Sequence, residues 1–169
     1  SARLLLNELF QRSLRVGKRA RAETDIGRGR LSISTAAVEL ASQVFEHIES
    51  CRALLVGAGE MGELTAQYLI DAGVAQLRVT NRTQARAEEL AARFGGEAVP
   101  FAALTEQLAA VDIVITSTAA TDPVIGHAEL RTAMHQRRGR PLFLIDIAVP
   151  RDIDPQARTI DNVFLFDID

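Results

Sequence analysis

The sequence contains one cysteine, Cys51, no tryptophan and one lysine, Lys18, among 169 residues. One cysteine excludes an internal disulfide framework and any thiolate metal cluster. Aromatic residues make up 5% of the chain, so the stacking surfaces of proteins that read single-stranded nucleic acid are largely missing. No stretch approaches the roughly 18 uncharged apolar residues of a membrane span, and no charged-then-apolar start indicates a signal peptide. We therefore expect one ordinary globular domain in the cytoplasm, with no membrane partner.

The formal net charge of −3 is unevenly distributed along the chain. Residues 1–30 hold eight Arg and Lys but three Asp and Glu, a net charge of +5, so the remaining residues sum to −8. Because these basic residues are interspersed with apolar ones, we interpret the basic start as a solvated helix face. Contact of residues 12–30 with a polyanion, tRNA among them, is the alternative.

Apolar residues recur at helical intervals in the first fifty positions. Their spacing predicts an amphipathic helix over residues 3–21 and a second helix over about 35–49. The features expected to separate the two helices are Gly27, Gly29 and an N-cap at Ser32 or Ser34.

From residue 52 onward, short runs that are apolar throughout alternate with helical stretches. Such runs predict the buried strands of a parallel sheet that is covered by helices on both faces. The expected strands are Ala53–Val56, Leu77–Thr80, Ala98–Phe101, Ile113–Thr116, Leu142–Ile147 and Val163–Phe166. Four helices are expected between these strands. The first two end near Ala72 and near Phe94, and the other two span about 103–110 and 127–137. Right-handed crossovers then predict an α/β fold, a doubly wound Rossmann-type sheet of order 3-2-1-4-5-6 with an N-terminal helical extension.

The predicted sheet begins late in the chain, and the chain stops on its last strand. We expect residues 1–31 to be a linker helix and loop from a preceding, absent catalytic domain. Residues 32–169 are then the Rossmann-type, nucleotide-binding domain. A compact domain with an N-terminal helical extension is the alternative.

The first predicted strand runs directly into a G-x-G-x-x-G sequence that opens a helix. That context, inside a βαβ unit, is typical of dinucleotide binding. Gly57 permits the tight turn, Gly59 lets the backbone approach a pyrophosphate, and Gly62 lets the helix pack close to the strand. The start of the helix offers free N–H groups to the phosphates. The candidate residues of this loop are Gly57, Ala58, Gly59, Glu60, Met61 and Gly62.

The second predicted strand ends in Asn81-Arg82-Thr83. In NAD-binding domains an Asp or Glu near this point bonds the ribose 2′-hydroxyl. A carboxylate would repel a 2′-phosphate, whereas the guanidinium of Arg82 matches it in shape and charge. Asn81 and Thr83 can add hydrogen bonds. The sequence therefore favours NADP(H) over NAD(H), the alternative being that Arg82 only begins a solvated helix.

Two further loops are expected at the same end of the sheet. Small residues after the fourth strand leave room for the cofactor and can bond its ribose or phosphates; they are Ser117, Thr118 and Ala119. Residues after the fifth strand can shape the nicotinamide pocket; they are Ala148, Val149 and Pro150. We expect Asp146, at the end of that strand, to anchor a backbone amide rather than to act in catalysis.

No pair of residues in the sequence resembles a nucleophile with its base. We interpret Cys51 as a small buried residue at the end of the sheet opposite the glycine loop. The three histidines, His47, His127 and His135, lack metal-ligand spacing and are expected on helix surfaces. The sequence therefore predicts no catalytic residue and no metal ligand.

Several stretches together resemble glutamyl-tRNA reductase, and the resemblance covers nearly the whole chain. They are Val16–Arg21, Ser32–Ala41, Gly57–Gly62, Asn81–Thr83 and Asp146–Ile153. The second and the last of these are more specific to that family than the glycine motif. The resemblance implies the central NADPH-binding domain of such an enzyme with the linker helix before it.

The resemblance also implies an activity. Members of that family reduce the glutamyl group of glutamyl-tRNA with NADPH to glutamate-1-semialdehyde, the entry to tetrapyrrole synthesis. Their nucleophilic cysteine, which forms a thioester, belongs to the catalytic domain, and no position of this chain matches its motif. The chain alone is then expected to bind NADP(H) without turnover. The intact protein would be a homodimer through a C-terminal helical domain, with glutamate-1-semialdehyde aminomutase as a downstream partner.

Two alternatives remain open at this point. The chain can be the cofactor domain of a shikimate or quinate dehydrogenase, which also pairs a glycine loop with Asn-Arg-Thr. It can also be a non-catalytic module that senses NADP(H) and controls the assembly of a partner. The long helical start and the Asp146–Ile153 stretch fit the shikimate enzymes poorly.

Overall fold

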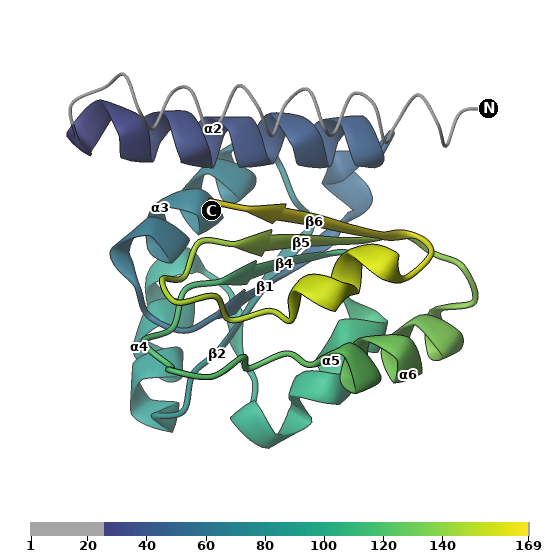
Figure 1. Cartoon of the computed structure of the whole chain (residues 1–169). Helices are drawn as coiled ribbons and strands as arrows, with labels where there is room; N and C mark the ends of the chain where they lie inside the picture. Colours follow the sequence, from purple (N-terminus) through teal and green to yellow (C-terminus); the bar gives the residue numbers. More distant parts are fainter. Residues whose placement is uncertain (1–25, 169) are drawn as a thin grey trace.

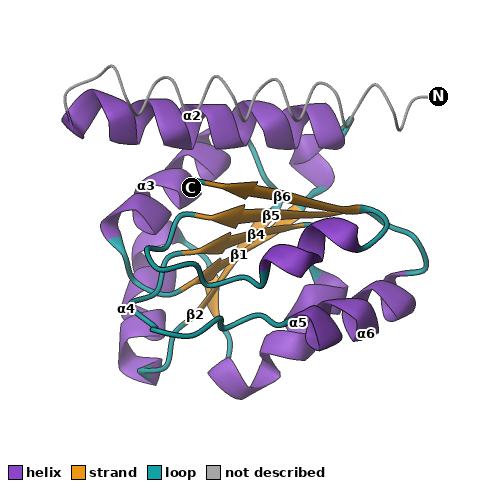
Figure 2. Cartoon of the chain, viewed as in Figure 1, coloured by secondary structure: helices purple, strands orange, loops and turns teal. Residues whose placement is uncertain are grey.

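The computed structural model describes residues 26–168 as one sheet between layers of helix (Figures 1 and 2). The strands are β1 (Arg52–Val56), β2 (Gln76–Thr80), β3 (Glu97–Ala98), β4 (Ile113–Thr116), β5 (Leu142–Asp146) and β6 (Val163–Asp167). The α-helices are α2 (Ile26–Val44), α3 (Glu60–Asp71), α4 (Gln84–Phe94), α5 (Leu104–Ala110) and α6 (His127–Arg137). Three short 3-10 helices complete the fold: η1 (Ile48–Ser50), η2 (Phe101–Ala103) and η3 (Pro155–Thr159). The predicted helix over residues 3–21 lies outside the described residues.

The six strands form one parallel sheet in the order β3-β2-β1-β4-β5-β6. This confirms the predicted doubly wound α/β fold. The chain reverses its direction of winding between β1 and β4, so the helices that follow these two strands, α3 and α6, lie on opposite faces of the sheet. A crevice at that position is where open α/β sheets bind their ligands.

Alternate residues of the central strands enter two separate hydrophobic cores, one on each face of the sheet. Helices α2, α3 and α4 cover the face that holds Leu55, Val79 and Ile115. Helices α5 and α6, with η3, cover the face that holds Leu54 and Val114. Burial on both faces explains why these strands are apolar throughout rather than alternating with polar residues.

The helix before the sheet differs from the prediction. The expected loop at Gly27 and Gly29 and the expected helix over 35–49 were wrong, because α2 runs unbroken over Ile26–Val44. Each glycine costs about 1 kcal/mol in a helix, but burial of one side of α2 offsets that cost. Ser34 does not cap the helix: its hydroxyl is buried and lies 2.9 Å from the Thr65 hydroxyl of α3. The expected division between residues 31 and 32 falls inside α2.

The third strand is shorter than predicted. Instead of Ala98–Phe101, β3 covers Glu97–Ala98, and Phe101 begins η2. Pro100 explains the difference, because it has no N–H to donate to a neighbouring strand. Within the described residues, no helix is both long enough and apolar enough to cross a membrane.

Candidate cofactor site

A cavity of about 490 Å³ lies at the carboxyl edge of the sheet, where the loops after five strands meet. This volume is in the range of small-molecule sites, about 300–1,000 Å³. Most of the predicted cofactor-binding residues line it: Gly57, Ala58, Gly59, Asn81, Arg82, Thr83, Ser117, Thr118, Ala119, Ala148 and Val149. The structure therefore brings together residues that lie as much as 92 positions apart, Gly57 and Val149 being the outermost.

The glycine loop is pressed against Ser117, the first residue after β4. Gly57 has φ +96°, and a Cβ built there would lie 2.5 Å from the Ser117 carbonyl oxygen. A Cβ on Gly62 would lie 2.5 Å from Ser117 Cβ and 3.1 Å from a methyl group of Leu55 in β1. Gly59 donates its N–H to the Ser117 carbonyl at 3.0 Å, and its missing Cβ faces the same serine. The three glycines thus let the loop pack directly on β4.

Helix α3 begins at this loop and presents its N-terminus to the cavity region. Its N-cap is Gly59, which has no side chain to cap the first turn. The unpaired N–H groups of a helix start carry partial positive charge and suit an anion. The loop and α3 together therefore have the backbone polarity that suits a phosphate group.

The β2 side of the cavity carries a cation backed by an aromatic ring. Arg82 is exposed, and its guanidinium carbon lies 5.9 Å from the centre of the Phe101 ring. Cation–π contacts of this length are worth about 0.5–1 kcal/mol at an exposed site and favour one orientation of the guanidinium. Asn81 donates its side-chain amide to the Thr83 carbonyl at 3.3 Å. This side presents a positive charge and no carboxylate among the lining residues.

Asp146 holds the loop that follows β5. It is 1% exposed and accepts hydrogen bonds from the N–H groups of Ala148 at 3.1 Å and Ile153 at 2.9 Å. It also accepts from the Thr116 hydroxyl of β4 at 3.1 Å. Burial raises the pKa of Asp146, and the backbone hydrogen bonds oppose that shift. The prediction that Asp146 anchors backbone amides is confirmed.

Four predicted residues lie beside the cavity rather than in its lining: Glu60, Met61, Gly62 and Pro150. Gly62 is buried beneath the loop, whereas Glu60 and Pro150 are exposed. Val149 does line the cavity and is 66% exposed, so an apolar side chain stands at its mouth.

Two lining residues, Phe101 and Ile147, were not predicted, and Ala120 continues the predicted run of small residues after β4. Phe101 looked like the end of a buried strand, and Ile147 looked like a strand residue. Pro100 was the available signal, because a proline ends the strand and releases Phe101 into the loop.

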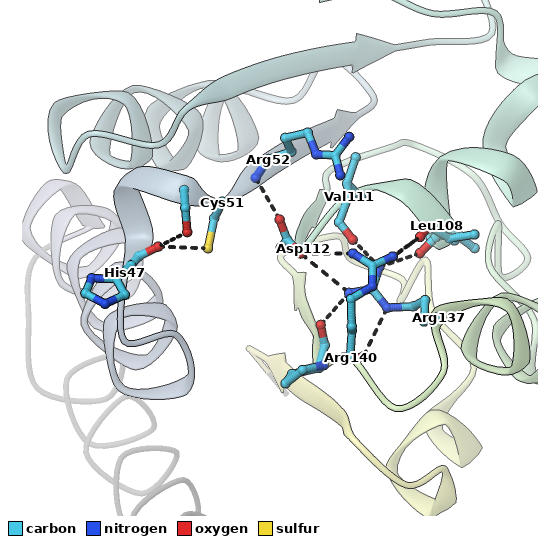
Figure 3. Close-up of polar contacts among 11 residues, drawn as sticks. His47, Cys51, Arg52, Leu108, Val111, Asp112, Arg137 and Arg140 are labelled. Carbon is cyan, nitrogen blue, oxygen red and sulfur yellow. Dashed lines mark hydrogen bonds and ion pairs between the residues drawn. The ribbon is translucent and has the colours of Figure 1, made fainter.

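Cys51 lies at the opposite edge of the sheet, directly before β1 (Figure 3). It is buried, and burial raises the pKa of its thiol to about 11. Its Sγ lies 3.5 Å from the His47 carbonyl oxygen, which can accept a weak hydrogen bond from the thiol. A thiol with this pKa is a poor nucleophile at neutral pH. The prediction of a small buried residue is confirmed.

The histidines occupy separate surface positions. His135 is exposed on α6 and His127 is partly exposed at its start, as predicted. His47 is exposed too, but it precedes the short η1 rather than lying within a helix. Over residues 26–168, no three His, Cys, Asp or Glu side chains are grouped to hold a metal ion.

Comparisons with known proteins give two kinds of match. A family model described as Shikimate / quinate 5-dehydrogenase matches residues 39–169. The chain is 49% identical to a glutamyl-tRNA reductase of Desulfovibrio desulfuricans over 166 residues, which is 98% of this chain and 39% of that protein. It is 52% identical to a glutamyl-tRNA reductase of Desulfotalea psychrophila over 165 residues, again 98% of this chain and 39% of that protein.

A solved structure resembles the chain over most of its length. The glutamyl-tRNA reductase from Methanopyrus kandleri superposes with a TM-score of 0.78 at 46% identity, covering 89% of this chain and 38% of that one. The chain therefore spans about two fifths of the length of the relatives that it matches.

Proposed function

Because the chain belongs to the shikimate / quinate 5-dehydrogenase domain family and is similar over nearly its whole length to glutamyl-tRNA reductases, we propose that it is the NADP(H)-binding domain of such a reductase. The observation that carries the cofactor assignment is the cavity at the switch point between β1 and β4. Its lining combines the glycine loop, up to the α3 N-cap Gly59, with Arg82, and α3 begins beside it without a side-chain cap.

The residues present fit a dinucleotide. The glycine loop packs so closely on Ser117 that any side chain at Gly57 would collide with backbone. Helix α3 begins at this loop without a side-chain cap, and such a helix start suits a pyrophosphate. The β2 side would hold the adenosine half, and the loops after β4 and β5 would border the nicotinamide half. Bound NADPH would supply a hydride for reduction of a carbonyl group.

The end of β2 supports NADP(H) rather than NAD(H). A ribose 2′-phosphate is dianionic, and a guanidinium can meet it with two parallel hydrogen bonds. Arg82 lines the cavity next to Asn81 and Thr83, where NAD-binding domains carry an acidic residue. The Phe101 ring lies next to the guanidinium, with a cation–π contact of 5.9 Å.

Replacing Arg82 by alanine is expected to raise the Kd for NADPH about thirtyfold, equivalent to about 2 kcal/mol, the range for a hydrogen bond to a charged group. The Kd for NADH should stay within about twofold, because NADH lacks the 2′-phosphate. Isothermal titration calorimetry measures both. Arg131→Ala, an exposed arginine of α6 outside the cavity, is the matched control. Unchanged NADPH affinity in Arg82→Ala would contradict the assignment.

The substrate proposal rests on the relatives rather than on the cavity. The family model alone fits a shikimate or quinate dehydrogenase as well, but it begins at residue 39. The similarity to glutamyl-tRNA reductases extends over 98% of the chain and supports glutamyl-tRNA as the substrate of the whole protein. Cys51, buried at the far edge with a thiol pKa of about 11, is unsuited to attack it. The acyl group must therefore be presented by another part of the whole protein.

The whole protein, supplied with NADPH and glutamyl-tRNA, is expected to release glutamate-1-semialdehyde and uncharged tRNA. The same protein supplied with 3-dehydroshikimate should oxidise no NADPH above background, as followed by the absorbance of the reduced nicotinamide. Reduction of 3-dehydroshikimate would instead assign the chain to a shikimate dehydrogenase. NADPH binding without either reaction would favour the sensing module.

The resemblance also supports two assembly proposals for the whole protein. It would form a homodimer through a C-terminal helical region, and glutamate-1-semialdehyde aminomutase would take up its reactive aldehyde product. Chromatography of the whole protein with and without the aminomutase tests both proposals.

A further inference from the structure

A second buried carboxylate, Asp152, lies in the loop between β5 and η3. It is fully buried, at 0% exposure, and its backbone carbonyl accepts hydrogen bonds from Val124 at 2.6 Å and Ile125 at 2.9 Å. Its side chain points to a different partner, Thr118, which lies in the loop after β4. Asp152 therefore connects the loop after β5 to the loop after β4 through both backbone and side chain.

The contact between Asp152 and Thr118 uses both carboxylate oxygens. Oδ2 accepts from the Thr118 backbone N–H at 2.8 Å, and Oδ1 accepts from the Thr118 hydroxyl. The same hydroxyl accepts the N–H of Ala120 at 3.1 Å. A hydroxyl has one proton to donate, and here Asp152 takes it. The orientation of Thr118 in the cavity wall is thus set by a residue outside the wall.

Burying the carboxylate of Asp152 costs free energy. Burial raises the pKa of Asp152, while the hydrogen bonds from Thr118 and the charge of Arg82 lower it. A buried carboxylate is tolerated when its oxygens are hydrogen-bonded. By contrast Asp154, two residues on, is partly exposed and accepts one N–H, that of Gln156, at the start of η3.

The position of this contact relates it to one half of the cavity. Thr118 and Ala148 line the cavity from the β4 and β5 side, whereas Arg82 lines it from the β2 side. The glycine loop after β1 separates the two sides. Asp146 and Asp152 hold the two loops of the first side, and neither aspartate lines the cavity itself.

We infer that Asp152 is a positioning residue that fixes, through Thr118, the half of the cavity that receives the nicotinamide. The inference rests on the proposed function, because it requires NADP(H) to lie across the two sides. In Asp152→Asn one oxygen still accepts the Thr118 N–H, but the new NH₂ group faces the hydroxyl. The hydroxyl must then accept that N–H and turn its proton elsewhere, so the wall on the nicotinamide side changes.

Two ligands separate positioning from a general loss of structure. NADPH spans both halves of the cavity, whereas adenosine 2′,5′-bisphosphate has no nicotinamide. In Asp152→Asn the Kd for NADPH is expected to rise about tenfold, the scale of one hydrogen bond to a charged group. The Kd for the bisphosphate should be unchanged or lower, since removing a negative charge by itself favours an anionic ligand. Asp122→Asn, the same charge change at an exposed loop residue, should alter neither.

The binding results for the two ligands test the role of Asp152 separately from the proposed function. Equal weakening of both ligands in Asp152→Asn, or no weakening of NADPH, would overturn the inference while leaving the proposed cofactor intact. A wild-type chain that binds neither ligand would overturn the proposed function, and the inference with it. Thermal unfolding of each variant identifies a loss of the whole fold, which would move both ligands together.

A double-mutant cycle tests whether Asp152 acts through Thr118. Thr118→Val removes the hydroxyl and keeps the size of the side chain and the charge of Asp152. If the hydroxyl carries the effect, Asp152→Asn should add less than about twofold to the NADPH Kd in the Thr118→Val background. If the two substitutions instead raise the NADPH Kd by factors that multiply, Asp152 does not act through the Thr118 hydroxyl. The bisphosphate Kd should again not rise in any variant of the cycle.

Discussion

Replacement of Arg137 by alanine is expected to lower the free energy of unfolding by about 3–5 kcal/mol, the range for breaking a buried charged network. Arg137 is the C-terminal residue of α6 and is 1% exposed. Figure 3 shows its guanidinium enclosed by backbone carbonyls and by Asp112. Removing it would leave those carbonyls buried without a donor and would open a cavity.

The contacts of Arg137 span several elements at the amino edge of the sheet. Nη1 donates to the carbonyls of Leu108 at 3.0 Å and of Val111, while Nη2 donates to the carbonyl of Pro141. Nε donates to the carbonyl of Arg140 at 3.2 Å. One side chain thus donates hydrogen bonds to the backbone carbonyls at the end of α5 and in the turn between α6 and β5. Burial lowers the pKa of Arg137 to about 10, so it keeps its charge at neutral pH.

Urea unfolding followed by circular dichroism measures this effect. Arg131→Ala, an exposed arginine on the same helix, should change the free energy of unfolding by less than about 0.5 kcal/mol. Because Arg137 lies at the edge of the sheet opposite the cavity, the folded fraction of Arg137→Ala should bind NADPH with wild-type affinity. An unfolding midpoint equal to that of Arg131→Ala would contradict the proposed role.

Gly57→Ala is expected to destabilise the fold by about 2–4 kcal/mol and to weaken NADPH binding more than tenfold. Two costs combine at this position. The backbone has φ +96°, which disfavours any residue with a Cβ, and the added Cβ would lie 2.5 Å from the Ser117 carbonyl oxygen. Backbone of the central strand region cannot move aside as a flexible side chain would. The glycine loop must shift instead, and with it the wall of the cavity.

Gly73→Ala separates the two costs. Gly73 has the same φ, +96°, but a Cβ there would meet no atom within 4 Å. Its substitution should cost only the backbone term, about 1–2 kcal/mol, and should leave NADPH affinity unchanged. Thermal unfolding and calorimetric titration of both variants give the comparison. Equal losses in Gly57→Ala and Gly73→Ala would show that the loop does not depend on its contact with Ser117.

The sequence predicted the sheet well because its signals are local. Strand β4 and helix α6 begin and end where the apolar runs and the spacing of apolar residues placed them. The order of the strands followed from the handedness of the crossovers. The prediction of helix α2 failed for the opposite reason. Its glycines favour a loop, and the burial that stabilises the helix comes from contacts with α3 and the sheet.

The residues of the candidate site could likewise be predicted only where their signal is local. Glycines, Arg82 and the small residues after β4 were visible as motifs, because each follows its own strand. The roles of Asp152 and Arg137 were not predicted, because their partners, Thr118 and Leu108, lie 34 and 29 residues away. A charged residue inside an apolar fold reveals its role only when the elements that enclose it are placed together.

Parallel titration of the wild-type chain with NADPH and NADH tests the central claim most directly. A cavity built for a dinucleotide, with Arg82 at its β2 side, should bind NADPH at least tenfold more tightly than NADH, the value of one charged hydrogen bond. One molecule of NADPH should bind per chain. Equal affinity for the two cofactors, or tighter binding of NADH, would contradict the account.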